Sequence, residues 1–284
     1  MRAGGVFGIL EGVLEPHRDD RRRILAMGGG GFTMEDRSAA LDHLVLALTG
    51  KPAPRICFLP TASGDGREQT TRFLERFSGW PCEPSILSLF ALGRDRVDPH
   101  ALLLSQDAIY VGGGSMRNLL AVWREHAVDQ AMRTAWERGI VLAGISAGAM
   151  CWFGGGITLS GGAPRAAAGL GFVPGSLSVH LDSEPERLPA FRRAVAAGVL
   201  PGGYAVDDCA ALVFAGTRLE GCVSSRPGAR VIGIGSDGAG STVEQALAVR
   251  SLPGSQPADA PIGAGEGHGV AELRALRSGR RRWD

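Results

Sequence analysis

The stretch Leu142-Ala143-Gly144-Ile145-Ser146-Ala147-Gly148-Ala149-Met150 decides the fold, because an apolar run here ends in a G-x-S-x-G pentapeptide and small residues follow. This order predicts a strand, a sharp turn and the start of a helix. A nucleophile elbow has this design, since a strained turn between small neighbours lifts the serine hydroxyl above the end of the strand. Ser146 is therefore the first candidate nucleophile. A merely structural strand-to-helix connection is the alternative, and the apolar residues Ile140 and Val141 favour the catalytic interpretation.

Composition limits the class of protein. The chain has 284 residues, 44% of them hydrophobic, and a formal net charge of +1. Such a chain can bury the core of one α/β domain, and its charge gives no electrostatic case for nucleic acid or a membrane surface. Five cysteines without a C-x-x-C pair suit a reducing compartment. No stretch has the length of a membrane span or of a signal-peptide core, so we expect a soluble, cytoplasmic protein acting on small molecules.

The first half of the chain alternates apolar runs with helical spacing. Strands are predicted at 24–27, 55–59, 85–90, 108–111 and 140–143, and helices at 36–48, 67–77 and 116–136. This alternation predicts an α/β fold in which a mostly parallel sheet carries helices on both faces. Function in such sheets gathers at the carboxyl ends of the strands. Glycine-rich turns at 28–31, 112–114 and 144–148 follow three of those ends, so we expect them to meet in one crevice.

The second half has shorter elements. Strands are predicted at 176–179, 204–206, 211–214, 218–223 and 230–234, with a helix at 188–197, and the last strands indicate a small antiparallel addition at a sheet edge. We expect one domain over residues 22–235. Residues 1–21 have the composition of a disordered extension, and the Gly/Pro/Ala-rich residues 236–284 that of a disordered tail.

Cofactor motifs are incomplete. The first glycine turn lacks the third glycine of G-x-G-x-x-G, because Thr33 occupies that place, and Gly50-Lys51 lacks the upstream glycine of a P-loop. Neither H-E-x-x-H nor another ligand spacing for a metal is present. We therefore expect neither a cofactor nor a metal.

A serine nucleophile needs a base, and His180 is the histidine whose position suits that role. It ends an apolar strand and precedes a polar loop, whereas the other histidines fall on predicted helices, in a connection or in the terminal segments. The acid that would orient His180 is left open by position alone. Asp182 and Glu184 lie close to His180 in sequence, and Asp207 and Asp208 follow a strand end.

Several motifs in one order resemble the peptidase E family, the aspartyl dipeptidases. The likeness runs from about residue 24 to 234 and rests on the segments 26–32, 57–65, 110–114, 144–149, 177–185 and 205–208. It implies a fold similar to that of class I glutamine amidotransferases, which is flavodoxin-like. It also implies that Ser146 is the nucleophile, His180 the base and Asp208 the acid, with the backbone N–H groups of Gly114 and Ala147 forming the oxyanion hole.

Three residues depart from the family pattern. Ser115 stands where Asn is usual, Leu159 where many members have Asp, and Cys209 where Gly follows the acid. The change at Ser115 is expected to alter substrate contacts, and Leu159 lacks a carboxylate that the family sometimes has in its active site. Cys209 bears on the position of Asp208, because glycine accepts a positive φ that other residues resist.

The expected function is a serine dipeptidase that cleaves small peptides with an N-terminal Asp, without nucleic-acid or membrane partners and with a homo-oligomer left open. Ser115, Arg187 and Arg165 are the candidate substrate contacts, the two arginines because an acidic substrate needs a cation. The alternatives are a related amide hydrolase resembling cyanophycinase, and a non-catalytic amidotransferase-like module that binds a ligand.

Overall fold

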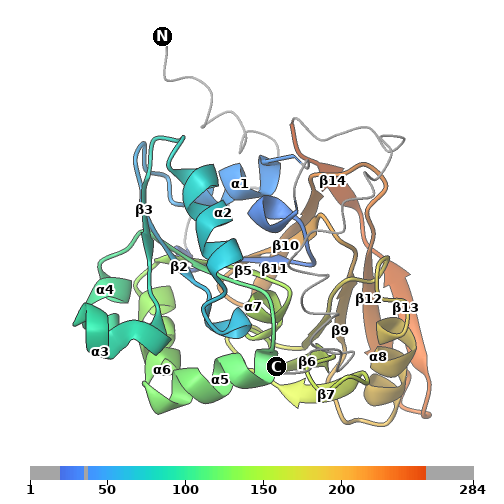
Figure 1. Ribbon diagram of the computed structural model, residues 1–284. Helices are drawn as coiled ribbons and strands as arrows, with labels where there is room; N and C mark the ends of the chain where they lie inside the picture. Colours follow the sequence, from blue (N-terminus) through green and yellow to red (C-terminus); the bar gives the residue numbers. More distant parts are fainter. Residues whose placement is uncertain (1–19, 35–37, 254–284) are drawn as a thin grey trace, which may run out of the picture.

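The computed structural model describes residues 20–34 and 38–253, which form two sheets with helices packed against them (Figure 1). The larger sheet has eight strands in the order β14-β11-β10-β1-β5-β4-β2-β3. Its strands are β1 (Arg23–Met27), β2 (Arg55–Leu59), β3 (Glu83–Ile86), β4 (Ala108–Val111), β5 (Val141–Ile145), β10 (Ala210–Ala215), β11 (Arg218–Ser224) and β14 (Val249–Ser251). The five strands β1 to β5 are mutually parallel, and β10 joins β1 antiparallel. The predicted α/β class is confirmed.

The strands of the parallel part are buried on both faces, as their continuous apolar runs predict. In β1, Ile24 and Ala26 face one core, whereas Leu25 and Met27 face the other, and all four side chains are fully buried. The helices are α1 (Ala40–Leu48), α2 (Arg67–Phe77), α3 (Leu92–Asp95), α4 (Pro99–Leu104), α5 (Met116–Glu125), α6 (Val128–Glu137), α7 (Ala147–Met150) and α8 (Arg187–Ala196), with 3-10 turns η2 (Gly31–Thr33), η3 (Thr61–Ser63) and η4 (Leu89–Ala91). Helices α1 and α2 cover one face, and α5, α6 and α7 the other. None of these helices is long and apolar enough to cross a membrane.

An aromatic cluster attaches α2 and η2 to the sheet. Phe73 stacks on Phe58 with ring centroids 4.8 Å apart and on Phe77 at 4.4 Å, and Phe32 meets Phe58 edge-on at 5.2 Å. The buried Tyr110 ring completes the cluster. Aromatic pairs of this kind add to the area they bury, so the turn after β1 and the helix after β2 are held against the same core.

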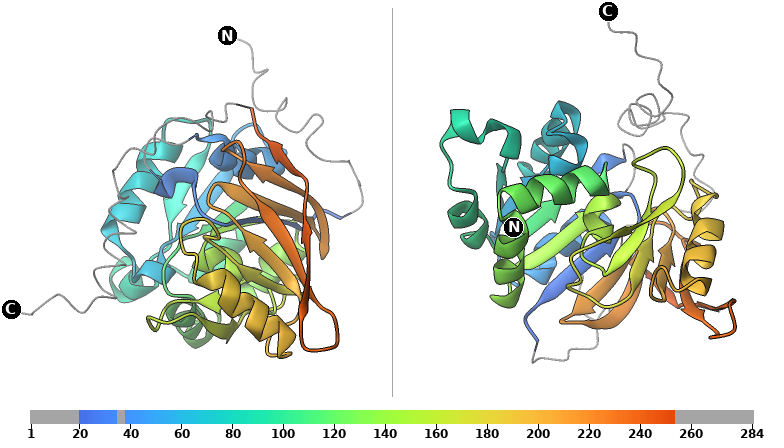
Figure 2. Two further views of the ribbon diagram at one scale, coloured as in Figure 1. Left: turned by 90° about the vertical axis from the view of Figure 1, so that its right-hand side faces the viewer. Right: turned by 90° about the horizontal axis from the view of Figure 1, so that it is seen from below.

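The predicted strands 211–214 and 218–223 are β10 and β11, which extend the large sheet antiparallel from β1. The other predicted strands of the second half belong to a second sheet, which contains both parallel and antiparallel pairs. Its six strands run in the order β13-β12-β9-β8-β6-β7. They are β6 (Gly155–Thr158), β7 (Arg165–Ala168), β8 (Ser176–Ser178), β9 (Gly203–Val206), β12 (Val231–Ser236) and β13 (Thr242–Ala246). Figure 2 shows this sheet beside the larger one, with α8 on its outer face. Strands β6 and β7 escaped prediction because glycine and alanine, which dominate them, have weak strand propensity.

The predicted domain end at 235 is wrong. Strand β13 pairs antiparallel with β12, β14 pairs parallel with β11, and the Leu252 side chain is buried in the core. A Gly/Pro/Ala-rich composition suggested a tail, but pairing with existing strands orders residues 242–251 regardless of local propensity. The predicted extension up to residue 19 and the tail from 254 lie outside the described residues. The third strand is also shifted, to Glu83–Ile86 rather than 85–90.

Beneath η2 lies a buried carboxyl group, that of Asp42 in α1. The Tyr110 hydroxyl donates to Asp42 Oδ1 at 3.3 Å, and the Phe32 backbone N–H is a further donor. Burial raises the pKa of Asp42 to about 7, because the charged form loses its hydration. Asp42 is therefore largely protonated in the folded protein at mildly acidic pH.

We expect the free energy of unfolding to decrease as the pH rises from 4 to 7, because the unfolded Asp42, with a pKa of 3.8, releases its proton before the folded one. Asp42→Asn should remove this contribution. The difference between the wild-type and variant free energies of unfolding should fall by about 4 kcal/mol between pH 4 and 8, at about 1.4 kcal/mol per pKa unit. Urea denaturation of both proteins at each pH measures it. Parallel pH curves would show that Asp42 ionises normally.

Candidate active site

Ser146 lies on the turn between β5 and α7, with φ 55° and ψ −114°. A non-glycine residue at positive φ is uncommon and is held there by its surroundings. Glycine on both sides makes the turn possible: a Cβ at Gly144 would lie 2.1 Å from the Gly148 carbonyl oxygen, and one at Gly148 would lie 2.3 Å from that of Val111. The Ser146 backbone N–H donates to the Met27 carbonyl at 3.0 Å. This is the strained strand-to-helix turn that the G-x-S-x-G pattern predicts.

His180 follows β8 and reaches Ser146 from the second sheet. Its Nε2 lies 2.8 Å from Ser146 Oγ, and its Nδ1 lies 2.6 Å from Asp208 Oδ1. An ionised carboxylate only accepts hydrogen bonds, so Nδ1 carries the proton and Nε2 is free to accept the serine O–H. The three side chains form one chain of hydrogen bonds although they come from three separate turns.

Asp208 is held from its side chain and its backbone. The Ser183 hydroxyl donates to Oδ2 at 2.6 Å, and the Asp208 backbone N–H donates to Asp182 Oδ1 at 2.8 Å. Arg226 forms an ion pair with Asp182. Asp182, one of the candidate acids, thus hydrogen-bonds to Asp208, as Ser183 does, and it is Asp208 that contacts the His180 ring.

Asp207 and Asp208 point to different partners. Asp207 is buried and pairs with Arg230, whose Nε lies 3.0 Å from Oδ2 and whose backbone N–H donates to the same oxygen at 2.8 Å. Cys209 takes the left-handed conformation, φ 64°, that its position requires, and the hydrogen bond from Asp208 to His180 is present alongside it. The cysteine therefore adds strain without moving Asp208 away.

Gly114 lines the pocket that contains Ser146, and Ala147 directly follows Ser146 in the chain. Gly114 has φ 142°, and a Cβ there would lie 2.2 Å from the Ala62 carbonyl oxygen. Ala147 begins α7, where N–H groups have no intrahelical partner. Neither N–H donates to a protein group within residues 20–34 and 38–253. Two donors beside the serine are therefore available to an oxygen of a bound molecule.

The three predicted glycine turns meet in one pocket that contains Ser146 and His180, which confirms the expected crevice. The pocket is lined by Gly29, Gly30, Thr33, Met34, Glu68, Gln69, Arg72, Gly113, Gly114, Ile145, Ser146 and His180. Helix α2 supplies its charged wall: Arg72 Nη2 lies 2.7 Å from Glu68 Oε1, and Arg72 Nη1 donates to the Thr33 carbonyl at 3.1 Å. The described residues contain no group of three His, Cys, Asp or Glu side chains that could hold a metal ion.

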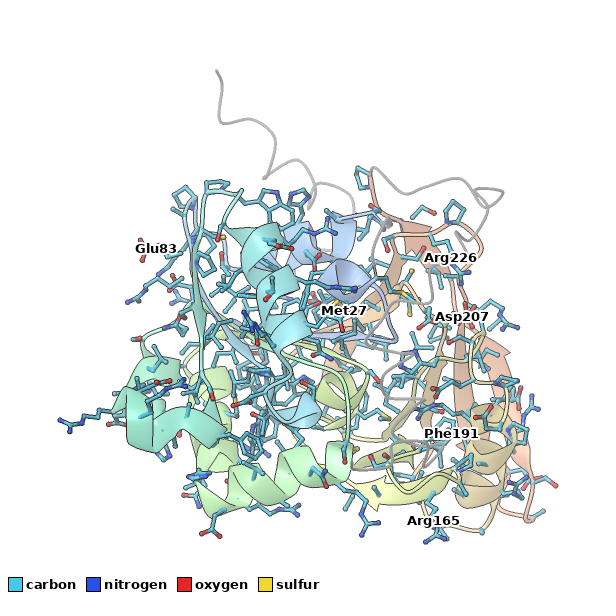
Figure 3. All side chains as sticks on the ribbon, viewed as in Figure 1. Met27, Glu83, Arg165, Phe191, Asp207 and Arg226 are labelled. Carbon is cyan, nitrogen blue, oxygen red and sulfur yellow. The ribbon has the colours of Figure 1, made fainter. Side chains whose placement is uncertain are left out.

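The three predicted substrate contacts do not line this pocket. The Ser115 hydroxyl accepts from the Asn118 backbone N–H at 3.2 Å as the N-cap of α5. Arg187 is buried and donates to Glu184 and to the Ile157 carbonyl. Arg165 is exposed on β7 and lines a separate pocket with Arg117 and Arg124; Figure 3 places it at the lower edge of the molecule, away from Met27 and Asp207. Leu159, which stands where many family members have Asp, is buried.

Sequence reasoning missed the contribution of α2. In the sequence, the polar side of this amphipathic helix gives no indication of a functional site, and it includes Glu68, Gln69 and Arg72. Ser183 stood in the segment that carried the resemblance, but nothing in its spacing predicted the contact with Asp208.

Fold and site together place the chain among α/β proteins in which a serine, a histidine and an aspartate form one hydrogen-bonded chain. A family model described as Peptidase family S51 matches residues 24–221. The chain is 46% identical over 209 residues to a Bacillus subtilis (strain 168) protein named Uncharacterized peptidase YgaJ, and the match covers 74% of this chain and 90% of that protein. The chain therefore belongs to peptidase family S51, and the predicted peptidase E resemblance is confirmed.

Solved structures share the fold. A peptidase from an acI-B1 Actinobacterium superposes with a TM-score of 0.58 at 19% identity, over 80% of this chain and 94% of that one. A putative peptidase E protein from Listeria monocytogenes EGD-e gives a TM-score of 0.50 at 16% identity, over 70% of this chain and 96% of that one. At these identities the likeness concerns the fold alone.

Arg187 should prove important for stability rather than substrate binding. Arg187→Met removes the cation from a buried ion pair and should lower the free energy of unfolding by about 3–5 kcal/mol. The matched control on the same helix is Arg192→Met, which breaks an exposed pair with Glu244 and should cost about 1 kcal/mol or less. Urea denaturation compares them. A stable Arg187→Met protein with a raised KM for peptides would reinstate Arg187 as a substrate contact.

Proposed function

We propose that the protein is a serine peptidase that hydrolyses dipeptides through Ser146, His180 and Asp208. The observation that carries this proposal is the continuous hydrogen-bond chain from Ser146 Oγ through His180 to Asp208, which opens into a pocket with two unpaired N–H donors. Membership of a peptidase family supports the same chemistry.

The reaction follows from the geometry. His180 Nε2 takes the proton of Ser146 Oγ as this oxygen attacks the peptide carbonyl carbon, and the carbonyl oxygen becomes an oxyanion bound by the N–H groups of Gly114 and Ala147. The C–N bond then breaks, and His180 returns the proton to the leaving amine. A water molecule attacks the acyl-enzyme, gives its proton to His180, and releases the acid as Oγ recovers its proton. Asp208 keeps the proton on Nδ1 and stabilises the imidazolium.

Ser146→Ala should abolish turnover and labelling by a serine-directed fluorophosphonate, with the fold retained. Asp208→Asn should lower kcat by about 10⁴-fold, because the amide stabilises the wrong histidine tautomer. Asp207→Asn is the matched control, since Asp207 pairs with Arg230 and should affect stability more than kcat. Steady-state hydrolysis of a dipeptide library measures these effects.

Undiminished turnover by Ser146→Ala would refute the serine mechanism. Labelling of wild-type Ser146 without hydrolysis of any dipeptide would favour the cyanophycinase-like amide hydrolase. Absence of both labelling and hydrolysis would favour a ligand-binding module.

For substrate choice we propose a preference for an N-terminal Asp, with Arg72 as the cation in place of Arg187 and Arg165. Arg72 lines the pocket that contains Ser146, and a guanidinium can grip a carboxylate bidentately. Glu68 beside it offers a negative charge to the free α-ammonium group of a dipeptide. Arg72 and Glu68 thus match the negative side chain and the positive α-ammonium group of an N-terminal Asp residue.

Arg72→Lys and Arg72→Gln should reduce the preference for Asp-Leu over Asn-Leu by about tenfold or more, mainly by raising KM for Asp-Leu. Arg67→Gln on the exposed part of the same helix is the control and should leave the preference unchanged. The measurement is kcat/KM for the two isosteric dipeptides. Equal kcat/KM values for the two dipeptides in the wild type would mean that the enzyme does not recognise the charge of the Asp side chain. The hydrolase mechanism would be unaffected by that result.

A further inference from the structure

The peptide bond between Gly113 and Gly114 carries the Gly114 N–H, one of the two proposed oxyanion donors, and both glycines line the pocket that contains Ser146. Glycine is required on this loop by close contacts: a Cβ at Gly112 would lie 2.8 Å from Gln69 Oε1 and 3.0 Å from the Phe58 ring, and one at Gly114 would overlap the Ala62 carbonyl. At Gly113 the Ser146 Cβ is 3.3 Å from the place that a Cβ would take. A side chain at Gly113 would therefore be in tight contact with Ser146, and one at Gly114 would collide with η3.

The presence of glycine on both sides leaves the orientation of the Gly113–Gly114 peptide weakly defined by its own backbone. A peptide unit between two glycines meets little steric resistance to rotation, because glycine populates positive and negative φ about equally. Rotation by half a turn would exchange the Gly114 N–H for the Gly113 carbonyl and direct an acceptor where a donor is needed. Because oxyanion stabilisation depends on preorganised donors, such rotation would remove it.

Gln69 holds the other end of the same peptide unit. Its Nε2 donates to the Gly113 carbonyl oxygen at 3.4 Å, and it lines the pocket that contains Ser146. The opposite orientation of the amide would set Oε1 against that carbonyl, two acceptors together, so the hydrogen bond defines the orientation. Oε1 is buried and has no hydrogen-bond partner in the described part of the chain. Burial of this acceptor without a partner carries a cost.

Helix α2 gives Gln69 a rigid base. Phe73, one turn further along, is fully buried in the aromatic cluster, and Phe77 stacks on it. On the far side of the loop, the Ser115 backbone N–H donates to the Ala62 carbonyl at 2.8 Å. The Gly113–Gly114 peptide is therefore fixed at its carbonyl by α2 and at the following residue by η3.

We propose that Gln69 is a positioning residue that locks the Gly113–Gly114 peptide with its N–H toward the oxyanion. The proposal rests on the proposed serine peptidase function. Gln69 acts on the transition state through the backbone, without contact with the reacting atoms.

The test compares Gln69→Leu and Gln69→Glu with the matched control Thr70→Val, which loses a hydrogen bond to the Gly66 carbonyl on the same helix but lies outside the pocket lining. Gln69→Leu should lower kcat by about 10–100-fold, somewhat less than removal of an oxyanion donor, with KM changed little. Gln69→Glu should lose at least as much at neutral pH, because a carboxylate repels the carbonyl. Thr70→Val should keep the wild-type kcat.

A dipeptide aldehyde separates positioning from general damage, because its adduct with serine places an oxygen in the oxyanion hole. Its inhibition constant should rise with the fall in kcat/KM, while the affinity for a product dipeptide stays unchanged. Wild-type kcat and aldehyde affinity in Gln69→Leu would overturn the proposal, and so would a rise in KM alone or an equal loss in Thr70→Val.

Crystal structures of the wild type and Gln69→Leu test the lock without any turnover. The expected result is a rotated or doubly oriented Gly113–Gly114 peptide in the variant, and an unchanged peptide overturns the lock. Should the wild type neither hydrolyse peptides nor label at Ser146, the proposed function fails, whereas the peptide orientation still decides whether Gln69 holds this loop.

Discussion

The arrangement around Ser146 depends on backbone atoms that touch where side chains would normally separate them. Gly144 packs against the Gly148 carbonyl, and Gly148 against the carbonyl of Val111 at the end of the neighbouring strand β4. A single methyl group at either glycine would overlap these oxygens. The contact therefore brings α7 down onto the ends of β4 and β5, and it holds Ser146 at a positive φ with its hydroxyl raised.

The pocket forms where two sheets meet. The serine comes from the parallel sheet, and His180 and Asp208 follow strands of the second sheet. Asp182, Ser183 and Arg226 fix the acid from that side, and α2 closes the opposite wall with Gln69 and Arg72. Since each group is held by a different element, the spacing of the three proposed catalytic side chains depends on the packing of the sheets against each other rather than on any local motif.

Backbone strain is concentrated in the same place. Ser146, His180 and Cys209 are three of the six non-glycine residues with positive φ among the described residues, and Cys209 directly follows the acid. Each such residue costs about 1–3 kcal/mol, which the surrounding structure must supply. The buried aromatic cluster and the two cores on either face of the large sheet are the sources of that stability.

The sequence by itself determined the parallel α/β core and the sharp turn at Ser146, because apolar periodicity and glycine spacing are local signals that backbone sterics translate directly. It also predicted His180 as the base from its position at a strand end. Position in the sequence did not distinguish Asp207 from Asp208, and the family resemblance indicated Asp208. Of these two side chains, only that of Asp208 contacts His180 in the structure. The second sheet, the ordering of residues 242–251 and the pocket wall on α2 were decided by tertiary structure. Strand pairing in these segments overrides weak strand propensity. Gln69 and Arg72 reach the pocket only because α2 packs beside a loop more than forty residues away, and spacing in the sequence carries no information at that separation.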